Sequence, residues 1–216
     1  GALILSLQNG VDNAERIAAA VPNPVYAAVV YVGAEADAPG RVRHTGRGDL
    51  VIGLPRRVPA RGDAAKDLSA ISRMFENAGV RCPVAADIDA ALWTKLAINC
   101  ACNPVSALAN ARYGAMLAHA PTRELMERIV RETADIAAAD GIRVDADSLV
   151  EAVWQVAGAM PAQQSSTAQD LQRGKPTEID AINGFVVQRA RALGRDAPVN
   201  YSLHALVKAR EAAARE

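Results

Sequence analysis

The sequence predicts an α/β segment followed by an all-α segment, with a boundary near residue 87. In residues 1–87, short runs of apolar and β-branched residues alternate with helix-like stretches, and turn residues separate them. Beyond residue 87, almost every stretch carries the hydrophobic period of a helix. The Ala-rich composition, in which only 4% of residues are aromatic, also favours helices.

The first segment is predicted to be one end of an α/β sheet, too small to complete a doubly wound domain by itself. Gln8-Asn9-Gly10 stops an apolar run that predicts a fully buried strand, and Asp12 or Asn13 is a candidate helix cap. A later helix is amphipathic, with Leu68, Ile71, Met74 and Phe75 on one face. The expected strands are 2–7, 25–32, 41–45, 49–53 and 80–84, and the expected helices are 12–20 and 60–77.

The second segment is predicted to consist of helices joined by short turns. Gly141 and Gly194 follow two of the helical patterns, as is typical of helix ends, and Asp145 or Asp147 is a candidate cap. Pro104 is expected to interrupt the first helix. The expected helices are 88–110, 122–139, 147–157, 165–172, 177–193 and 197–213.

Composition excludes several classes of function. Lys plus Arg and Asp plus Glu number 24 each, so the net charge is zero. We therefore expect no extended basic surface that would bind nucleic acid or an anionic membrane. The odd count of 3 cysteines argues against a disulfide framework and favours a reducing, cytoplasmic compartment. The apolar run at residues 2–7 is too short to span a bilayer. No residues have the spacing of metal ligands or of a nucleophile elbow.

Gly46-Arg47-Gly48 begins like a dinucleotide-binding fingerprint. The stretch lacks the third glycine, and no strand–turn–helix pattern surrounds it. We interpret it as a hairpin turn.

The most informative stretch runs from Leu92 to Pro104. Lys95, Asn99 and Asn103 recur every four residues, so a helix would place them on one face, one turn apart. Asn is unfavourable inside a helix, and Pro104 would leave a backbone carbonyl without its donor. One interpretation is a solvated surface face. The other is a polar stripe that lines a cleft, where Lys95 supplies charge and a proton and the asparagines fix a polar ligand.

Two further stretches carry polar residues in unusual places. Thr177, Glu178 and Asp180 are explained as residues of a helix N-terminus. That explanation does not extend to Asn183-Gly184, where glycine costs about 1 kcal/mol in a helix, so a close backbone approach is expected. Gln8-Asn9-Gly10 follows a strand, at a place where α/β sheets commonly bind ligands, although a plain tight turn also explains it.

Taken in order, these motifs resemble those of the ketopantoate reductase family over essentially the whole chain. They are Gln-Asn-Gly after a strand, Leu-Trp-x-Lys-Leu-x-x-Asn-x-x-x-Asn-Pro, Ser-Ser-x-x-Gln-Asp and Thr-Glu-Ile-Asp-x-Ile-Asn-Gly. The resemblance implies that residues 1–87 are the C-terminal part of an NADP-binding Rossmann-type domain. It implies that residues 88–216 are a helical substrate-binding and dimerisation domain, like the C-terminal domain of 6-phosphogluconate dehydrogenase. The active site would lie in the cleft between them.

The resemblance also implies residue roles. Lys95 matches the catalytic lysine, Asn99 and Asn103 match substrate-contacting asparagines, and Ser166 matches the serine on the carboxylate side of the substrate. Glu178 matches a glutamate at the cofactor and active site, and Asn9 matches an asparagine near the nicotinamide.

The implied reaction is the NADPH-dependent reduction of 2-dehydropantoate to pantoate, in pantothenate and coenzyme A biosynthesis. Hydride would reach the ketone carbon, and Lys95 as ammonium would stabilise the alkoxide and donate the proton. Glu178 would orient either Lys95 or a substrate hydroxyl. A semi-buried cleft would lower the pKa of Lys95 from about 10.4 towards working pH.

Two departures from the family pattern leave alternatives open. Thr167 stands where the family often has Met, and no strand–Gly-x-Gly-x-x-Gly–helix unit is present to cradle the cofactor phosphates. The alternatives are a reductase for a related small 2-oxo acid, or a non-catalytic helical dimerisation fragment. Strand edges exposed by an incomplete sheet favour association, so a partner chain or a homodimer is expected to cover them.

Overall fold

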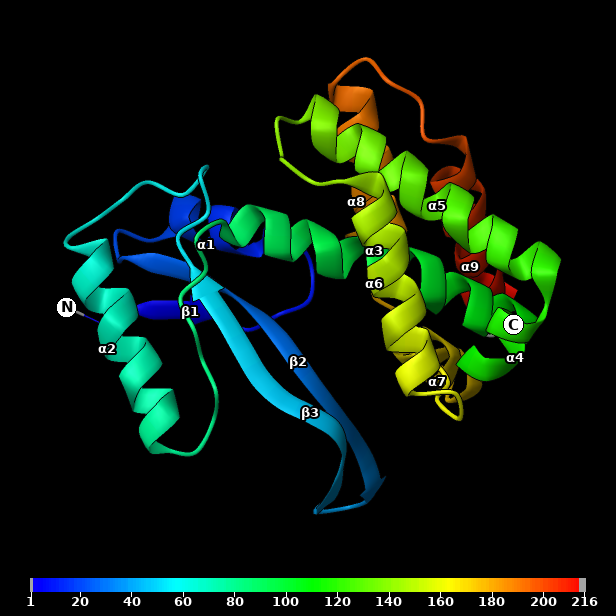
Figure 1. Ribbon diagram of the computed structural model, residues 1–216, viewed down its shortest axis with the longest axis horizontal. Coiled ribbons are helices and arrows are strands. Elements are labelled where there is room, and N and C mark those ends of the chain that lie inside the picture. Colours follow the sequence, from blue (N-terminus) through cyan, green and yellow to red (C-terminus); the bar gives the residue numbers. More distant parts are fainter. Residues whose placement is uncertain (1, 214–216) are drawn as a thin grey trace. The chain divides into compact units, whose positions relative to one another are not determined.

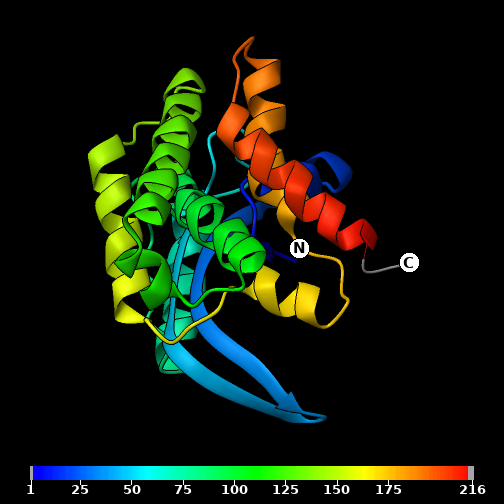
Figure 2. The same ribbon diagram turned by 90° about the vertical axis from the view of Figure 1, so that its right-hand side faces the viewer.

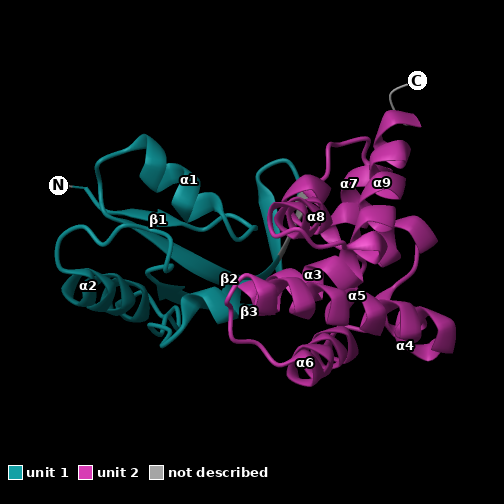
Figure 3. Cartoon of the chain, turned by 90° about the horizontal axis from the view of Figure 1, so that it is seen from above, with its two compact units in different colours: residues 1–92 teal, residues 93–216 magenta. Residues whose placement is uncertain are grey.

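The computed structural model describes residues 2–213, and the side chains of all of these except residues 34–37 and 45. The chain divides into two compact units, residues 1–92 and 93–216 (Figure 3). The division between residues 92 and 93 falls inside α3 (Ile88–Ala109), a few residues after the boundary expected near residue 87. Among the described residues, no helix has both the length and the apolar character needed to cross a membrane.

Within the described part of the first unit, the strands form a three-stranded sheet with the order β1-β2-β3. β1 (Ile4–Ser6) and β2 (Val25–Ala38) pair in parallel, and α1 (Asn13–Ala20) connects them. These elements form a βαβ unit, the usual way to join parallel strands. β3 (Arg41–Gly53) pairs antiparallel with β2 to make a long hairpin (Figure 1), and α2 (Ala64–Asn77) follows it.

Helices cover both faces of this sheet. Successive residues of a strand point to opposite faces, so β2 contributes to two separate cores. Val25 and Val29 pack in one core with Ala14 of α1, whereas Tyr26 packs in the other with Leu68 of α2. Burial on both faces explains why β2 is apolar throughout its first half rather than alternating.

The predicted hairpin turn at residues 46–48 is wrong, because β3 continues through it. Tyr31 pairs with Asp49 and Gly33 pairs with Gly46, so β3 carries one more residue than β2 between these pairs. The extra residue makes a β-bulge, and Arg47 there has a φ of 43°. The Arg47 guanidinium lies 4.2 Å from the centre of the Tyr31 ring and donates to Asp49.

Two apolar stretches of the first unit are less buried than predicted. Leu3 and Leu7 flank β1 and are 40% and 49% exposed, so the strand at residues 2–7 is not fully buried. In α2, Leu68 and Ile71 are buried as predicted, but Met74 is 60% exposed.

In the first unit, the segment from Val80 to Val84 forms a single bridge to Ile52 rather than the predicted strand.

The second unit is helical, as predicted. Figures 1 and 2 show α9 lying against α8 and α5. The short helix α4 was not predicted. After α3, the elements are α4 (Tyr113–Ala118), α5 (Ala120–Ala139), α6 (Ala146–Ala159), α7 (Ser166–Gln172), the 3-10 helix η1 (Ile179–Ala181), α8 (Asn183–Ala192) and α9 (Pro198–Ala213).

The predicted helix at residues 177–193 is wrong, because η1 and α8 are separate elements. Ile182 breaks the helical path with φ −106° and ψ −102°. Asn183-Gly184 therefore opens α8 instead of interrupting a longer helix. The close approach expected at Gly184 is confirmed, since an added Cβ would lie 3.0 Å from Nε2 of His204 and 3.2 Å from the carbonyl oxygen of Ile179.

Pro104 does not interrupt α3, which continues unbroken through it. Proline removes the donor for the Cys100 carbonyl, and the Asn183 side chain supplies a replacement: its Nδ2 donates to that carbonyl at 3.2 Å. Asn183 is fully buried and also donates to Asn200 Oδ1 at 2.9 Å. Asn200 Nδ2 in turn donates to Glu132 Oε1 at 2.8 Å. The network ties α3, α5, α8 and α9 together.

Replacing Asn183 with Ala is expected to lower the free energy of unfolding of the second unit by about 1–3 kcal/mol, because it leaves buried partners unpaired. Asn23→Ala is a matched control, since Asn23 Nδ2 donates to the carbonyl of Ala2 at an exposed position. This control should change stability by less than about 0.5 kcal/mol. Urea unfolding of the chain measures both, and equal midpoint shifts would contradict the role given to Asn183.

Candidate active site

The polar stripe on α3 lies in a largely buried setting. Lys95 and Asn99 are partly buried, and Asn103 is only 5% exposed. The residues between them are mostly buried as well: Leu96, Ala97, Cys100, Ala101 and Cys102. The interpretation of this stripe as the solvated face of a surface helix is therefore wrong.

Lys95 has a strongly shifted pKa. Burial disfavours the ammonium form, while the negative charge of Glu178 favours it, and the net result is a pKa lowered to about 8. Lys95 is on α3, whereas Glu178 is an exposed residue at the start of η1. The fold therefore brings together an amine and a carboxylate that lie far apart in the sequence, close enough for one charge to act on the other.

The two serines of the Ser-Ser motif differ in their environments. Ser165 is 1% exposed and caps α7, because its Oγ accepts from the Ala168 N–H at 3.1 Å. The same hydroxyl donates to the Asn103 carbonyl, also at 3.1 Å, which fixes the start of α7 to α3. Ser166 follows in the first turn and is exposed. Ser165 is thus a structural residue, and Ser166 presents its hydroxyl at the surface.

The stripe on α3 ends at Asn103. Ser106, one turn later, is fully buried and donates to the Ala111 carbonyl at 2.7 Å. Asn110 lies beyond α3 with a φ of 50°, and its Oδ1 accepts from Gln164 and Gln172. Both residues help to hold the turn after α3.

Asp170 on α7 is a candidate that sequence reasoning missed. Burial raises its pKa, and the nearby charge of Glu178 raises it further. Asp170 therefore lies within electrostatic reach of Glu178. The only signal in the sequence was its place in the Ser-Ser-x-x-Gln-Asp motif.

The remaining candidate, Asn9, lies in the first unit. The Gln8-Asn9-Gly10 turn joins β1 to α1, at the carboxyl end of a parallel strand. The Asn9 carbonyl accepts from Asn13 Nδ2 at 2.6 Å, and Gly10 has a φ of 109°, a conformation that favours glycine. Ligands of open α/β sheets bind at such turns.

Across residues 2–213, no group of three or more His, Cys, Asp or Glu side chains is arranged to hold a metal ion. The candidate residues named above offer an amine, carboxylates, amides and a hydroxyl. Such a set suits proton transfer to an oxygen and the binding of a small polar molecule.

Two family models match this chain, and both describe ketopantoate reductases. The family described as "Ketopantoate reductase PanE/ApbA C terminal" matches residues 87–211, and the family described as "Ketopantoate reductase PanE/ApbA" matches residues 1–57. The 2-dehydropantoate 2-reductase of Halobacterium salinarum is 36% identical over 209 residues, which cover 96% of this chain and 67% of the relative.

Solved structures agree with the sequence matches. The PanE/ApbA family ketopantoate reductase from Ralstonia eutropha JMP134 is 41% identical with a TM-score of 0.88, covering 100% of this chain and 68% of that one. A D-mandelate dehydrogenase, solved with NADH and anilino(oxo)acetate, has a TM-score of 0.90 at 21% identity, covering 98% and 67%. The latter likeness concerns the fold alone. The family matches and the 36% identity to the curated Halobacterium salinarum relative place the chain in the ketopantoate reductase family of oxidoreductases.

Proposed function

We propose that this protein reduces 2-dehydropantoate to pantoate, a step of pantothenate and coenzyme A biosynthesis. The observation that carries the proposal is Lys95, a partly buried amine with a pKa of about 8 on which the charge of Glu178 acts. A side chain that titrates near working pH is well suited to act as a general acid. The name of the Halobacterium salinarum relative, 2-dehydropantoate 2-reductase, supports the same reaction.

Lys95 is the proposed general acid. As ammonium, its Nζ donates a hydrogen bond to the ketone oxygen of the substrate and stabilises the negative charge that develops there. The same group then transfers a proton to that oxygen, which yields the alcohol. Glu178 raises the pKa of Lys95 against the effect of burial, so more of the amine is protonated at neutral pH than burial alone would allow.

The substrate is held by the neighbours of Lys95 in the second unit. Asn99 lies one helical turn from Lys95 and Asn103 two turns away, so both amides continue the same face of α3. The exposed hydroxyl of Ser166 is the proposed donor to the substrate carboxylate. Glu178 orients either Lys95 or a hydroxyl of the substrate.

The proposed cofactor is a nicotinamide dinucleotide, and NADPH is the proposed form. The turn at Gln8-Asn9-Gly10 fits the nicotinamide end, because it follows β1 of a βαβ unit and carries no side chain at Gly10. The chain has no Gly-x-Gly-x-x-Gly turn for the phosphates. Asn9 would hold the nicotinamide, which when bound supplies the hydride.

Lys95→Ala is expected to lower kcat for 2-dehydropantoate reduction by about 100-fold or more, because it removes the general acid. The matched control is Lys66→Ala, which removes an exposed lysine of α2 and should leave kcat unchanged. Steady-state kinetics of the protein as encoded, including any residues outside this chain, measure both. A kcat within a few-fold of the parent for Lys95→Ala would rule out the general-acid role.

The finer assignment of substrate and cofactor is tested by kcat/KM. We expect the highest value for 2-dehydropantoate with NADPH, at least about tenfold above other small branched 2-oxo acids and above NADH. A higher kcat/KM for another 2-oxo acid would mean that the protein is a reductase whose substrate is that acid and not 2-dehydropantoate. No reduction of any 2-oxo acid with either cofactor would favour a non-catalytic helical module.

A further inference from the structure

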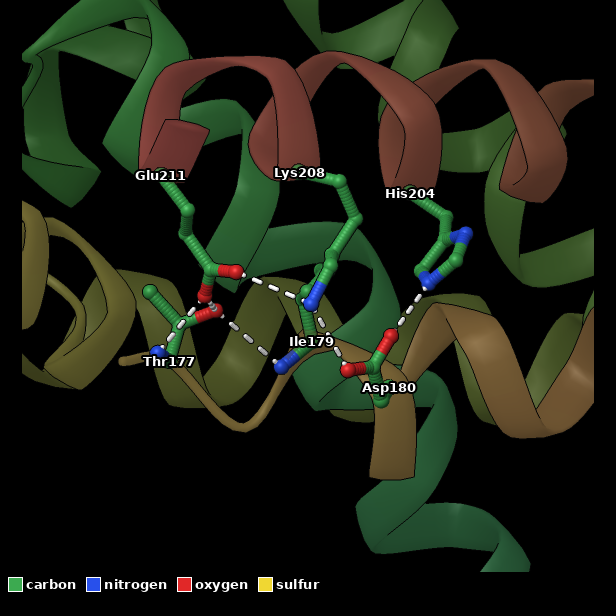
Figure 4. A network of polar contacts seen from close by, with 6 residues as sticks. All are labelled: Thr177, Ile179, Asp180, His204, Lys208 and Glu211. Carbon is green, nitrogen blue, oxygen red and sulfur yellow. Dashed lines mark hydrogen bonds and ion pairs between the residues drawn. The ribbon is translucent and has the colours of Figure 1, made fainter. Parts of the chain in front are cut away.

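Three side chains of α9 form a row that faces the segment from Thr177 to Asp180 (Figure 4). His204, Lys208 and Glu211 are spaced by four and three residues, so they lie on one face of the helix. Their partners, Thr177 and Asp180, stand on either side of Glu178 in the sequence.

Glu211 fixes the residue before Glu178. Its Oε1 accepts from the Thr177 N–H at 2.7 Å and from the Thr177 hydroxyl at 2.6 Å. The Glu211 side chain is only 5% exposed, so its charge is shielded from water. Burial opposes that charge, but the bonds from Thr177 and Lys208 outweigh burial and hold the pKa of Glu211 below its usual value.

Lys208 and His204 fix the second residue after Glu178. Lys208 Nζ lies 2.9 Å from Asp180 Oδ2 and 3.0 Å from Glu211 Oε2, so one ammonium joins both anchor points. His204 Nε2 lies 2.6 Å from the other oxygen of Asp180. Bonds to Asp180 and Glu211 raise the pKa of Lys208, so the bridging cation is stabilised.

The backbone between these anchors is also held. Ile179, next to Glu178, is fully buried, and its N–H donates to Thr177 Oγ1 at 3.3 Å. Both neighbours of Glu178 are thus fastened, one by Glu211 and the other by the core, while Glu178 itself remains exposed.

We propose that His204, Lys208 and Glu211 are positioning residues, which hold Glu178 where its carboxylate acts on Lys95. This inference rests on the proposed pairing of Lys95 with Glu178. A simple helix-capping role does not explain the row, because Thr177 and Asp180 do not begin a long helix. Instead, the backbone N–H and the hydroxyl of Thr177 both donate to the buried Glu211 carboxylate, which holds the residue next to Glu178 against α9.

The titration midpoint of Lys95, followed by NMR of ¹³C-labelled lysine in this chain, tests the proposal. Glu178→Gln should lower the midpoint, because the charge that raises the pKa of Lys95 is lost. Lys208→Met should also lower it, by at least about half as much. The sign is diagnostic, since removing the positive charge of Lys208 would by itself raise the pKa of Lys95.

Three variants complete the experiment. Lys208→Arg should restore the midpoint, because arginine also bridges two carboxylates. Arg131→Met is the matched control: Arg131 bridges Glu127 and Asp147 on α5 and α6, and its loss should not lower the midpoint. Thr177→Val removes one hydrogen bond to Glu211 without changing charge, so it should lower the midpoint in the same direction even if Lys208→Met fails to fold.

Other outcomes overturn the proposal in distinguishable ways. An unchanged or raised midpoint in folded Lys208→Met and Thr177→Val, together with a lowered one in Glu178→Gln, refutes the positioning row and leaves the Lys95–Glu178 pair intact. An unchanged midpoint in Glu178→Gln refutes the Lys95–Glu178 pair and with it the positioning row, whereas the reductase function is tested separately by the kinetics of Lys95→Ala.

Discussion

The hydrogen bond from Asn183 to the Cys100 carbonyl is the constraint on which the second unit depends. Pro104 has no N–H, so the carbonyl of Cys100 lacks its usual helical donor. Cys100 is buried, and an unpaired buried acceptor is costly. Asn183 supplies the donor and is itself bound to Asn200, which is bound to Glu132. Losing Asn183 would remove the side-chain donor to the Cys100 carbonyl and one partner of Asn200, whereas Asn200 and Glu132 would keep their bonds to each other.

This constraint sets the place of the candidate site within the second unit. Lys95 and Asn99 lie on α3 just before the Cys100 carbonyl, while Glu178 lies just before Asn183. Fastening the start of α8 to the middle of α3 therefore brings the two segments of the site to the same region. Asn200 also ties the start of α9 to the network. Further along α9, Lys208 and Glu211 bind Asp180 and Thr177, the residues on either side of Glu178.

Two opposing effects determine the charge of Lys95. Loss of hydration lowers its pKa, and the carboxylate of Glu178 raises it, but the first effect is larger because the value falls from 10.5 to about 8. The fold needs both effects: burial brings the amine close to its titration range, and Glu178 keeps it largely protonated at neutral pH. A fully exposed lysine in the same stripe would remain a weak acid.

The sequence predicted the parts of the site that depend on local spacing. The stripe of Lys95, Asn99 and Asn103 follows from helical periodicity. The close approach at Gly184 was expected from the cost of glycine inside a helix, although Gly184 lies in the first turn of α8. Contacts between distant segments could not be predicted. The bulge at Arg47 depends on pairing with β2, the break at Ile182 depends on packing around Asn183, and the row on α9 has the ordinary pattern of a solvated helix face.

The central claim is that Lys95 acts as an ammonium whose pKa is set near 8, and the pH dependence of kcat/KM for reduction tests it most directly. Because the protonated form is the active one, kcat/KM should be constant below about pH 7 and fall about tenfold per pH unit above about pH 8. A profile that stays flat from about pH 7 to about pH 10 would contradict the account, since the free lysine pKa is about 10.4.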